Sequence, residues 1–245
     1  NKDNPIINFR SYGDDPSKVS DYGTSFIKGI QDNGIIACAK HYPGHGNTSV
    51  DSHTSLPIIS GSYEELMQSE FYPFKRAVEA GVKMIMTGHI ALPSIDSSLL
   101  PASHSPIITK QILRDDWGYD GLIVTDGLEM GALTKSSWAG ESAIRAVEAK
   151  IDEIVVFLSA SESHNNKNLN RSIKESLLGF EEVIKLANDV NIPVHGDIST
   201  AFGCPFEGEI PSKKIVEITK VYKSLGMKGV TLGDTTGMAT PPVVT

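Results

Sequence analysis

The residues best suited to chemistry lie in one short stretch of the chain. It contains Lys40, His41, His45, Asp51 and His53, set among glycines and other small residues. Imidazole and carboxylate side chains exchange protons near neutral pH, so this composition indicates a loop that transfers protons. A Ser-His-Asp triad is only weakly indicated, because a serine adjacent to His53 in sequence need not hydrogen-bond to it.

Strand ends must position this loop and its partners. The apolar run at 35–39 predicts a buried parallel strand, so the polar residues begin where that strand ends, and α/β folds place their sites there. His89 ends a second predicted strand, and Asp126 ends a third. An aspartate in this position is often only the N-cap of the next helix. His89 is suited equally to binding a ligand and to being a strand-end histidine whose ring is hydrogen-bonded within the protein, and His45 is expected to brace the loop.

Composition excludes several classes of partner. The chain has 245 residues, 40% of them hydrophobic, and a formal charge of −8 without a basic cluster, which argues against nucleic acid. No apolar run approaches the roughly 18 residues of a membrane span. Two cysteines, Cys38 and Cys204, form no framework, so we expect a reducing, cytoplasmic setting. The chain opens on Asn1 rather than Met, and we expect it to be trimmed from a longer sequence.

Strand and helix patterns alternate along the whole chain, which predicts a parallel sheet with right-handed crossovers. We expect one structural unit with six to eight strands. A six-stranded sheet would leave two open edges, so we also expect closure by strand recruitment from the termini or by a homodimer. The predicted strands are 35–41, 82–90, 121–127, 153–158, 192–198 and 229–232. The predicted helices are 17–32, one that starts at 62 and is interrupted near Pro73, 105–117, 141–149, 172–190 and 211–226. A polar loop is predicted at 159–170.

The first part of the chain resembles glycoside hydrolase family 3, in its bacterial β-N-acetylglucosaminidase branch. The resemblance covers the first 148 residues and rests on motifs in the family's order, among them Lys-His-Tyr-Pro-Gly-His-Gly at 40–46, Asp-Ser-His at 51–53 and Ile-Val-Thr-Asp at 123–126. Further matching segments are 4–5, 10–13, 88–90 and 101–103.

The resemblance implies a role for each residue of the candidate site. Asp126 would attack the anomeric carbon, and His53, oriented by Asp51, would act as acid and then as base. An ionised carboxylate paired with a group that titrates near neutrality suits a retaining hydrolase. Three residues would bind sugar hydroxyls: Arg10, Lys40 and His41. No metal or other cofactor is implied. The family's opening strands, one of which brings an aspartate that grips the sugar, are expected upstream of Asn1.

The second part of the chain resembles hydroxymethylglutaryl-CoA lyase. The matching segments are 157–162, 168–173, 202–208 and 232–237. Both resembled families are TIM barrels, so the resemblance implies a TIM-barrel-derived (β/α) repeat assembled from a fragment at 1–149 and a fragment at 150–245. An engineered or recombined chimera is the expected origin.

The lyase resemblance supplies little of that enzyme's chemistry. The segments that carry its metal ligands and catalytic cysteine have no counterpart here, and Cys204 matches a structural Gly-Cys-Pro turn. Asp234 and Thr235 match residues near the acyl-CoA. His195 and Asp197 share one face of a predicted strand, but two ligands do not make a metal site.

Three functions from different classes therefore remain open. The first is retaining hydrolysis of a small β-N-acetylglucosaminide, and the second is a folded barrel scaffold without catalysis. Acyl-CoA lyase activity ranks third.

Overall fold

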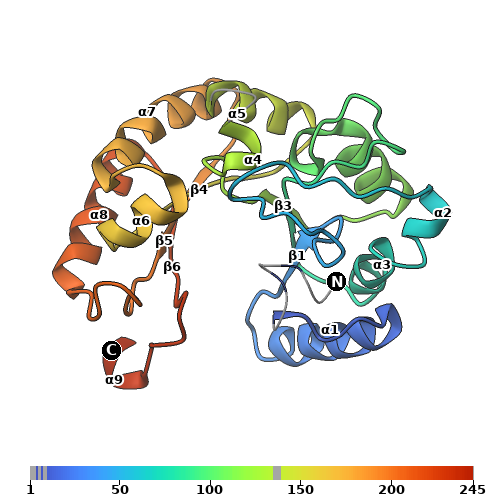
Figure 1. Ribbon diagram of the computed structural model, residues 1–245, viewed down its shortest axis with the longest axis horizontal. Coiled ribbons are helices and arrows are strands. Elements are labelled where there is room, and N and C mark those ends of the chain that lie inside the picture. The colour runs from blue at the N-terminus through green and yellow to red at the C-terminus, as the bar shows by residue number, and fades with distance from the viewer. Residues whose placement is uncertain (1–3, 5–6, 8–9, 135–138, 245) are drawn as a thin grey trace.

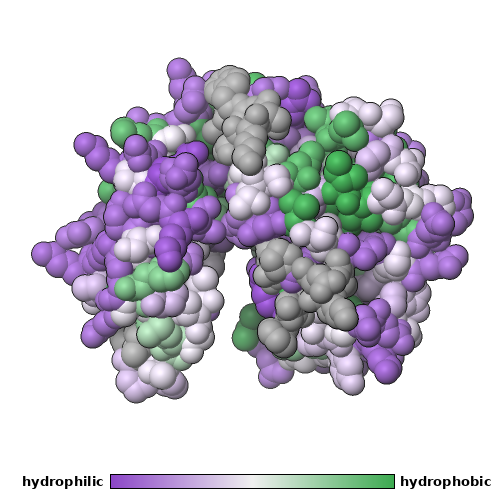
Figure 2. Space-filling model, in the orientation of Figure 1, coloured by the Kyte–Doolittle hydropathy of each residue, from purple (hydrophilic) through white to green (hydrophobic). Residues whose placement is uncertain are grey.

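The computed structural model describes Asn4, Ile7 and residues 10–134 and 139–244, and it forms an arch with two limbs (Figure 1). The N-terminal limb contains β1 to β3, and the C-terminal limb contains β4 to β6. Helices lie on the outside of both limbs, and α4 (Gly131–Thr134) and α5 (Ala139–Glu148) lie near the top of the arch. The space-filling view shows an open groove between the limbs (Figure 2).

The N-terminal limb is a three-stranded parallel sheet with helices on one side. Its strands are β1 (Cys38–Tyr42), β2 (Met84–Thr87) and β3 (Leu122–Thr125), in that order. Its helices are α1 (Pro16–Gln31), α2 (Tyr63–Leu66), α3 (Phe71–Glu79), the short 3-10 turn η2 (Ala102–His104) and the π-type helix η3 (Pro106–Asp116).

An aromatic cluster holds this limb together behind the sheet. The ring of Tyr42 stacks on Phe71 at 6.0 Å and meets Trp117 edge-on at 5.8 Å. The Tyr42 hydroxyl donates to the carbonyl of Ile108 at 2.9 Å, so this fully buried phenol is satisfied. The cluster therefore fixes the C-terminal end of β1, where the candidate loop begins.

The C-terminal limb repeats the arrangement. Its parallel strands are β4 (Ile154–Ser159), β5 (Val194–Ser199) and β6 (Gly229–Leu232), and its helices are α6 (Glu162–Leu169), α7 (Ile173–Asp189), α8 (Ser212–Leu225) and α9 (Pro241–Val244). Ser172 opens α7 with the predicted capping box, in which its hydroxyl accepts from the N–H of Glu175. Behind the sheet, Phe180 packs edge-on against Tyr222 at 5.9 Å.

The expectation of one parallel sheet of six to eight strands in a TIM-barrel-derived repeat is wrong. Among the described residues the six strands form two separate three-stranded sheets, and β3 meets β4 in an isolated bridge between Val124 and Glu153 with a few backbone hydrogen bonds around it. Side chains interrupt the ladder at this point: Asp152 accepts from the N–H of Ile123 at 2.6 Å, and Thr125 Oγ1 accepts from the N–H of Val155 at 2.9 Å. Each side chain takes a donor that a regular ladder would use.

The burial pattern along β5 shows which face of the second sheet borders the groove. Along β5, Val194, Gly196 and Ile198 are buried beneath the helices, whereas His195 and Asp197 are only partly buried. Successive side chains of a strand point to opposite faces, so the partly buried set faces the groove. The interior of the arch is thus lined by polar side chains of the second sheet.

Two local predictions fail for physical reasons. The segment 159–170 was expected to be a polar loop but contains α6, which Ser161 caps by accepting from the N–H of His164. Ile35 and Ile36 were assigned to a buried strand, yet each is 63% exposed, because β1 starts at Cys38 and has no strand on its outer side among the described residues.

Candidate active site

Asp126 lies at the end of β3 and faces the groove. Its backbone N–H donates to the carbonyl of Thr87 at 2.8 Å, which ties it to β2, and its Oδ1 accepts from the N–H of Gly127 at 2.9 Å. Burial raises the pKa of Asp126, but the nearby His41, His89 and Lys40 and the Gly127 N–H lower it below its usual value. The carboxyl is therefore ionised at neutral pH, and its side chain is 21% exposed.

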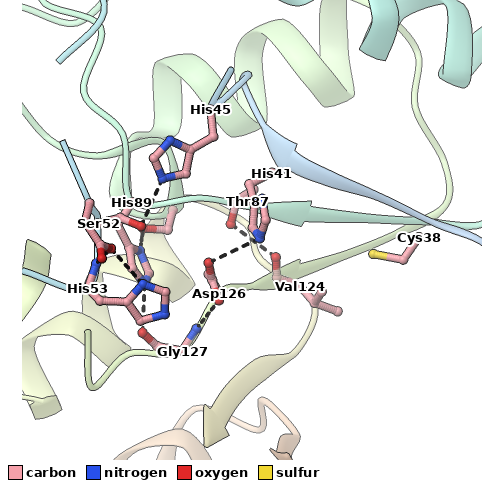
Figure 3. Close-up of polar contacts among 12 residues, drawn as sticks. Cys38, His41, His45, Ser52, His53, Thr87, His89, Val124, Asp126 and Gly127 are labelled. Atoms are coloured by element: carbon pink, nitrogen blue, oxygen red, sulfur yellow. Dashed lines mark hydrogen bonds and ion pairs between the residues drawn. The ribbon is translucent and has the colours of Figure 1, made fainter. Parts of the chain in front are cut away.

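His41 lies beside this carboxylate. Its Nε2 is 3.8 Å from Asp126 Oδ2 (Figure 3), and its buried Nδ1 has no hydrogen-bond partner among the described residues. Burial lowers the pKa of His41 to about 3, so the ring is neutral at pH 7. A neutral imidazole can orient the carboxylate or a ligand hydroxyl without adding a positive charge.

His53 lies on the other side of Asp126 from His41 (Figure 3), and it pairs with Asp51. Asp51 Oδ1 accepts from both the backbone N–H and the Nδ1 of His53, at 2.7 Å and 2.8 Å. This double contact fixes the ring with Nε2 directed away from Asp51. Both side chains are about one-third exposed, at 30% and 35%, so a ligand can reach the ring.

The His53 loop and the Asp126 loop are joined through their backbones. The N–H of Gly131 donates to the carbonyl of His53 at 3.1 Å, and that of Ala132 donates to the carbonyl of Ser52 at 3.0 Å. The structure thus brings His53 onto the loop that begins at Asp126, although 73 positions separate the two residues in the sequence.

Phe157 of β4 packs against both loops. Its ring meets that of His53 edge-on at 6.4 Å. It also covers Gly127, where an added Cβ would lie 2.1 Å from Phe157 Cδ1, so only glycine fits next to Asp126. The second sheet therefore supplies a wall of the candidate site, which the sequence analysis did not anticipate.

Two other histidines have structural roles. His45 Nδ1 pairs with Thr48 Oγ1 at 2.6 Å, and its Nε2 pairs with Ser52 Oγ at 3.1 Å. The serine next to His53 therefore serves the loop rather than a triad. His89 is fully buried, with one ring nitrogen on Ser103 Oγ and the other on the carbonyl of Gly127, both at 2.8 Å. Both rings brace the site; this was expected for His45, whereas the sequence left a ligand role equally open for His89.

The three residues expected to bind sugar hydroxyls lie along one pocket. Arg10, Lys40 and His41 all line a cavity of about 520 Å³ between α1, α3 and the open edge of β1. Lys40 and Arg10 are exposed, whereas His41 is 9% exposed. The cavity is within the size range of small-molecule sites. Asp51, His53 and Asp126 are not among its lining residues, so His41, which also contacts Asp126, is the link between the cavity and the carboxylate.

Glu129 is a buried acid that the sequence analysis missed. It is 4% exposed, its Oε2 accepts from the N–H of Phe157 at 3.3 Å, and its Oε1 has no hydrogen-bond partner within the part of the chain that the structure describes. Burial raises the pKa of Glu129 to about 8. The only signal in the sequence is its position three residues after Asp126, which does not distinguish it from a surface glutamate.

In the C-terminal limb, Cys204 has a structural setting. Cys204 is buried and contacts Ser161 Oγ at 3.0 Å, in keeping with a structural turn. Within the described ranges, no three His, Cys, Asp or Glu side chains gather as metal ligands. Over the same residues, no helix is both long and apolar enough to cross a bilayer.

Comparison with known proteins gives two kinds of relative. The model of the glycosyl hydrolase family 3 N terminal domain matches residues 1–191. Beta-hexosaminidase A of Pseudoalteromonas piscicida is 35% identical over 163 residues, which are 62% of this chain and 27% of that protein. The cytoplasmic 3-hydroxy-3-methylglutaryl-CoA lyase of Rattus norvegicus is 50% identical over 96 residues, which are 39% of this chain and 28% of that protein. Both expected resemblances are confirmed.

A solved structure extends the likeness to the fold. A glycoside hydrolase family 3 beta-N-acetylglucosaminidase from Paenibacillus sp. str. FPU-7 superposes with a TM-score of 0.63 and 31% identity. The superposition covers 91% of this chain and 43% of that one. This chain thus spans less than half the length of these hydrolase relatives.

Proposed function

Because the chain belongs to the family of the glycosyl hydrolase family 3 N terminal domain, we propose that it hydrolyses a β-N-acetylglucosaminide with retention of configuration. The observation that carries the proposal is the contact of His53 with Asp51, at 2.8 Å, on a loop bonded to the one that holds the ionised Asp126. A carboxylate nucleophile and an oriented imidazole are the two groups that a double displacement needs.

The first step forms a glycosyl-enzyme. A carboxylate oxygen of Asp126 attacks the anomeric carbon, the bond to the leaving oxygen breaks, and that oxygen takes the proton from His53 Nε2. Asp51 accepts from Nδ1 and so holds the ring with Nε2 free to exchange the proton. In the second step a water gives its proton to His53, its oxygen attacks the anomeric carbon, and Asp126 is released as a carboxylate. Arg10, Lys40 and His41 bind the sugar hydroxyls.

Replacement of His53 by Ala is expected to lower kcat/KM by roughly 100-fold or more for a substrate with a poor leaving group. For an activated aryl N-acetylglucosaminide, the rate of this first step should fall far less in the variant, because the leaving group needs no proton. Added azide should restore turnover and give the β-glycosyl azide, since azide attacks without a base. Turnover of both substrates by His53→Ala at the wild-type rate would contradict the role of His53 as acid and base. Absence of any hydrolysis by the wild-type chain would favour the scaffold without catalysis.

We also propose that the two limbs have different origins, with the hydrolase-like fragment at 1–149 and the lyase-like fragment at 150–245. The 50% identity to the lyase over 96 residues and the hydrolase relatives together support this division. A cytoplasmic setting belongs to the same proposal, because the two cysteines, Cys38 and Cys204, are free thiols.

A homodimer that covers the open strand edges is the proposed assembly. The outer sides of β1 and β6 have no strand partner among the described residues, and Ile36 next to β1 and Leu232 in β6 are 63% and 44% exposed. Exposed edges with apolar side chains favour pairing with another chain.

Replacement of Ile36 by Lys is expected to shift the protein toward monomer in sedimentation velocity, because a charge at the edge opposes pairing. Leu178→Lys is the matched control, since Leu178 is 57% exposed on α7, away from both edges. A wild-type chain that stays monomeric at high protein concentration would rule out this assembly.

A further inference from the structure

A row of polar side chains crosses the groove face of the second sheet. The strand register aligns Phe157 of β4 with Asp197 of β5, and Asp197 with Thr231 of β6. His195 precedes them on the same face, since residues two apart on a strand point the same way. None of these residues has a role in the reaction proposed above.

The row is a connected set of hydrogen-bonding groups. His195 Nδ1 is 3.4 Å from Glu153 Oε1, and its Nε2 is 2.8 Å from Thr231 Oγ1. The Thr231 hydroxyl also hydrogen-bonds Asp197. An added Cβ on Gly229 would lie 2.4 Å from His195 Cε1, so the ring occupies space that only glycine leaves open. The ring is therefore held in place.

This row belongs to the same groove as the candidate active site. Phe157 joins the two, because its ring meets that of His53 edge-on at 6.4 Å and it pairs in register with Asp197. Burial raises the pKa of Asp197. Thr231 is exposed and His195 is 28% exposed, so both can be reached from the groove.

The order of groups across the strands assigns this row to one side of the reaction. His41 lies beside Asp126 from β1, with its Nε2 3.8 Å from Asp126 Oδ2, and the sugar that forms the glycosyl-enzyme would bind on this side. On the other side come His53 and then Phe157, whose ring packs on both His53 and Gly127. Asp197 follows Phe157 in register. A proton donor must face the leaving group, so residues beyond His53 lie on the leaving-group side.

We propose that Phe157, His195, Asp197 and Thr231 form a subsite for a sugar as leaving group, with Asp197 and His195 binding its hydroxyls and Phe157 contacting its apolar face. This inference rests on the proposed function and deepens it. Its ligand chemistry is that of a polyol ring, because a carboxylate, an imidazole and a hydroxyl beside an aromatic wall match alternating hydroxyl and C–H surfaces. The preferred substrate would then be a β-linked disaccharide or longer chain.

Replacement of Asp197 by Ala is expected to lower kcat/KM for N,N′-diacetylchitobiose by roughly tenfold to 100-fold, the range for a lost hydrogen bond to a charged group. The kcat/KM for an aryl N-acetylglucosaminide should stay within about twofold, because that substrate has no leaving-group sugar. Thr231→Val should act in the same direction and preserves side-chain shape. Glu217→Ala is the matched control, since Glu217 is exposed on α8 behind the same sheet. Equal losses on both substrates would overturn the assignment.

Binding can be measured without turnover, which separates this inference from the proposed function. In the Asp126→Asn variant, addition of N,N′-diacetylchitobiose should shift the NMR signals of the His195 ring, and Asp197→Ala should weaken that binding roughly tenfold or more. A His195 ring that does not respond to the disaccharide would refute the subsite whether or not the wild-type chain hydrolyses anything. A response in a chain that proves inactive would support the subsite and reject only the proposed reaction.

Discussion

Replacement of Asp126 by Asn is expected to lower kcat/KM for an aryl N-acetylglucosaminide by roughly 1,000-fold or more. The amide is nearly the same size and its oxygen can still accept from the N–H of Gly127, so the loop should keep its shape. What is lost is the negative charge that attacks the anomeric carbon. Thermal unfolding and a circular dichroism spectrum should remain close to those of the wild-type chain, and the steady-state rate is the measurement.

The matched control for this variant is Asp115→Asn. Asp115 pairs with Lys110 on the surface, at 2.6 Å, and about half of its side chain is exposed, at 52%. Exposed ion pairs contribute little to stability, so this variant should retain full activity. Hydrolysis by Asp126→Asn at the level of Asp115→Asn would remove Asp126 from the reaction.

Replacement of Glu129 by Gln is expected to change how the free energy of unfolding depends on pH. The pKa of Glu129 is about 8 in the folded chain, raised from its ordinary value of 4.5. Because the folded-state pKa is raised, its stabilising contribution is complete below pH 4.5, falls as pH rises through 8, and is absent above that. The glutamine amide cannot ionise. The free energy of unfolding of the variant, relative to that of the wild-type chain, should therefore rise by a few kcal/mol between about pH 5 and pH 9.

Urea unfolding of both proteins at about pH 5 and pH 9 measures this difference. Glu182→Gln is the control, since Glu182 is exposed on α7 and the same chemical change there should not alter the pH dependence. Parallel stability curves for wild type and Glu129→Gln would mean that Glu129 is not a buried acid with a raised pKa.

Local signals in the sequence predicted most of the elements. The capping boxes at Ser62 and Ser172 mark the starts of α2 and α7, and β6 has the predicted bounds. Such signals act within a few residues, so they are readable without knowledge of the fold. For His89 the sequence left two roles open, a ligand and a hydrogen-bonded strand-end histidine, and its contacts with Ser103 and Gly127 favour the second.

The number of strands in one sheet could not be predicted in this way. Whether β3 and β4 pair depends on Asp152 and Thr125, whose side chains take backbone donors across the junction. The α6 helix was missed for a similar reason. It lacks an apolar stripe, and its buried Asn165 is satisfied by the N–H of Ser159 and the carbonyl of Arg171. These contacts are set by tertiary structure.

The candidate site was predictable where one motif contains the contact and not where the contact is long-range. Asp51 and His53 are two residues apart, so their pairing follows from the motif. The contribution of Phe157 depends on the approach of β4 to Gly127, which no local pattern encodes. The same is true of the unpaired Glu129 beneath it.

The central claim is that Asp126 forms a covalent bond to the sugar, and trapping of that intermediate tests it most directly. The wild-type chain would be incubated with 5-fluoro-N-acetylglucosaminyl fluoride, whose glycosyl-enzyme is hydrolysed slowly, and then digested and analysed by mass spectrometry. The account predicts one added sugar, located on the peptide that contains Asp126 and absent from Asp126→Asn. A chain that stays unlabelled, or that carries the sugar on another residue, would contradict it.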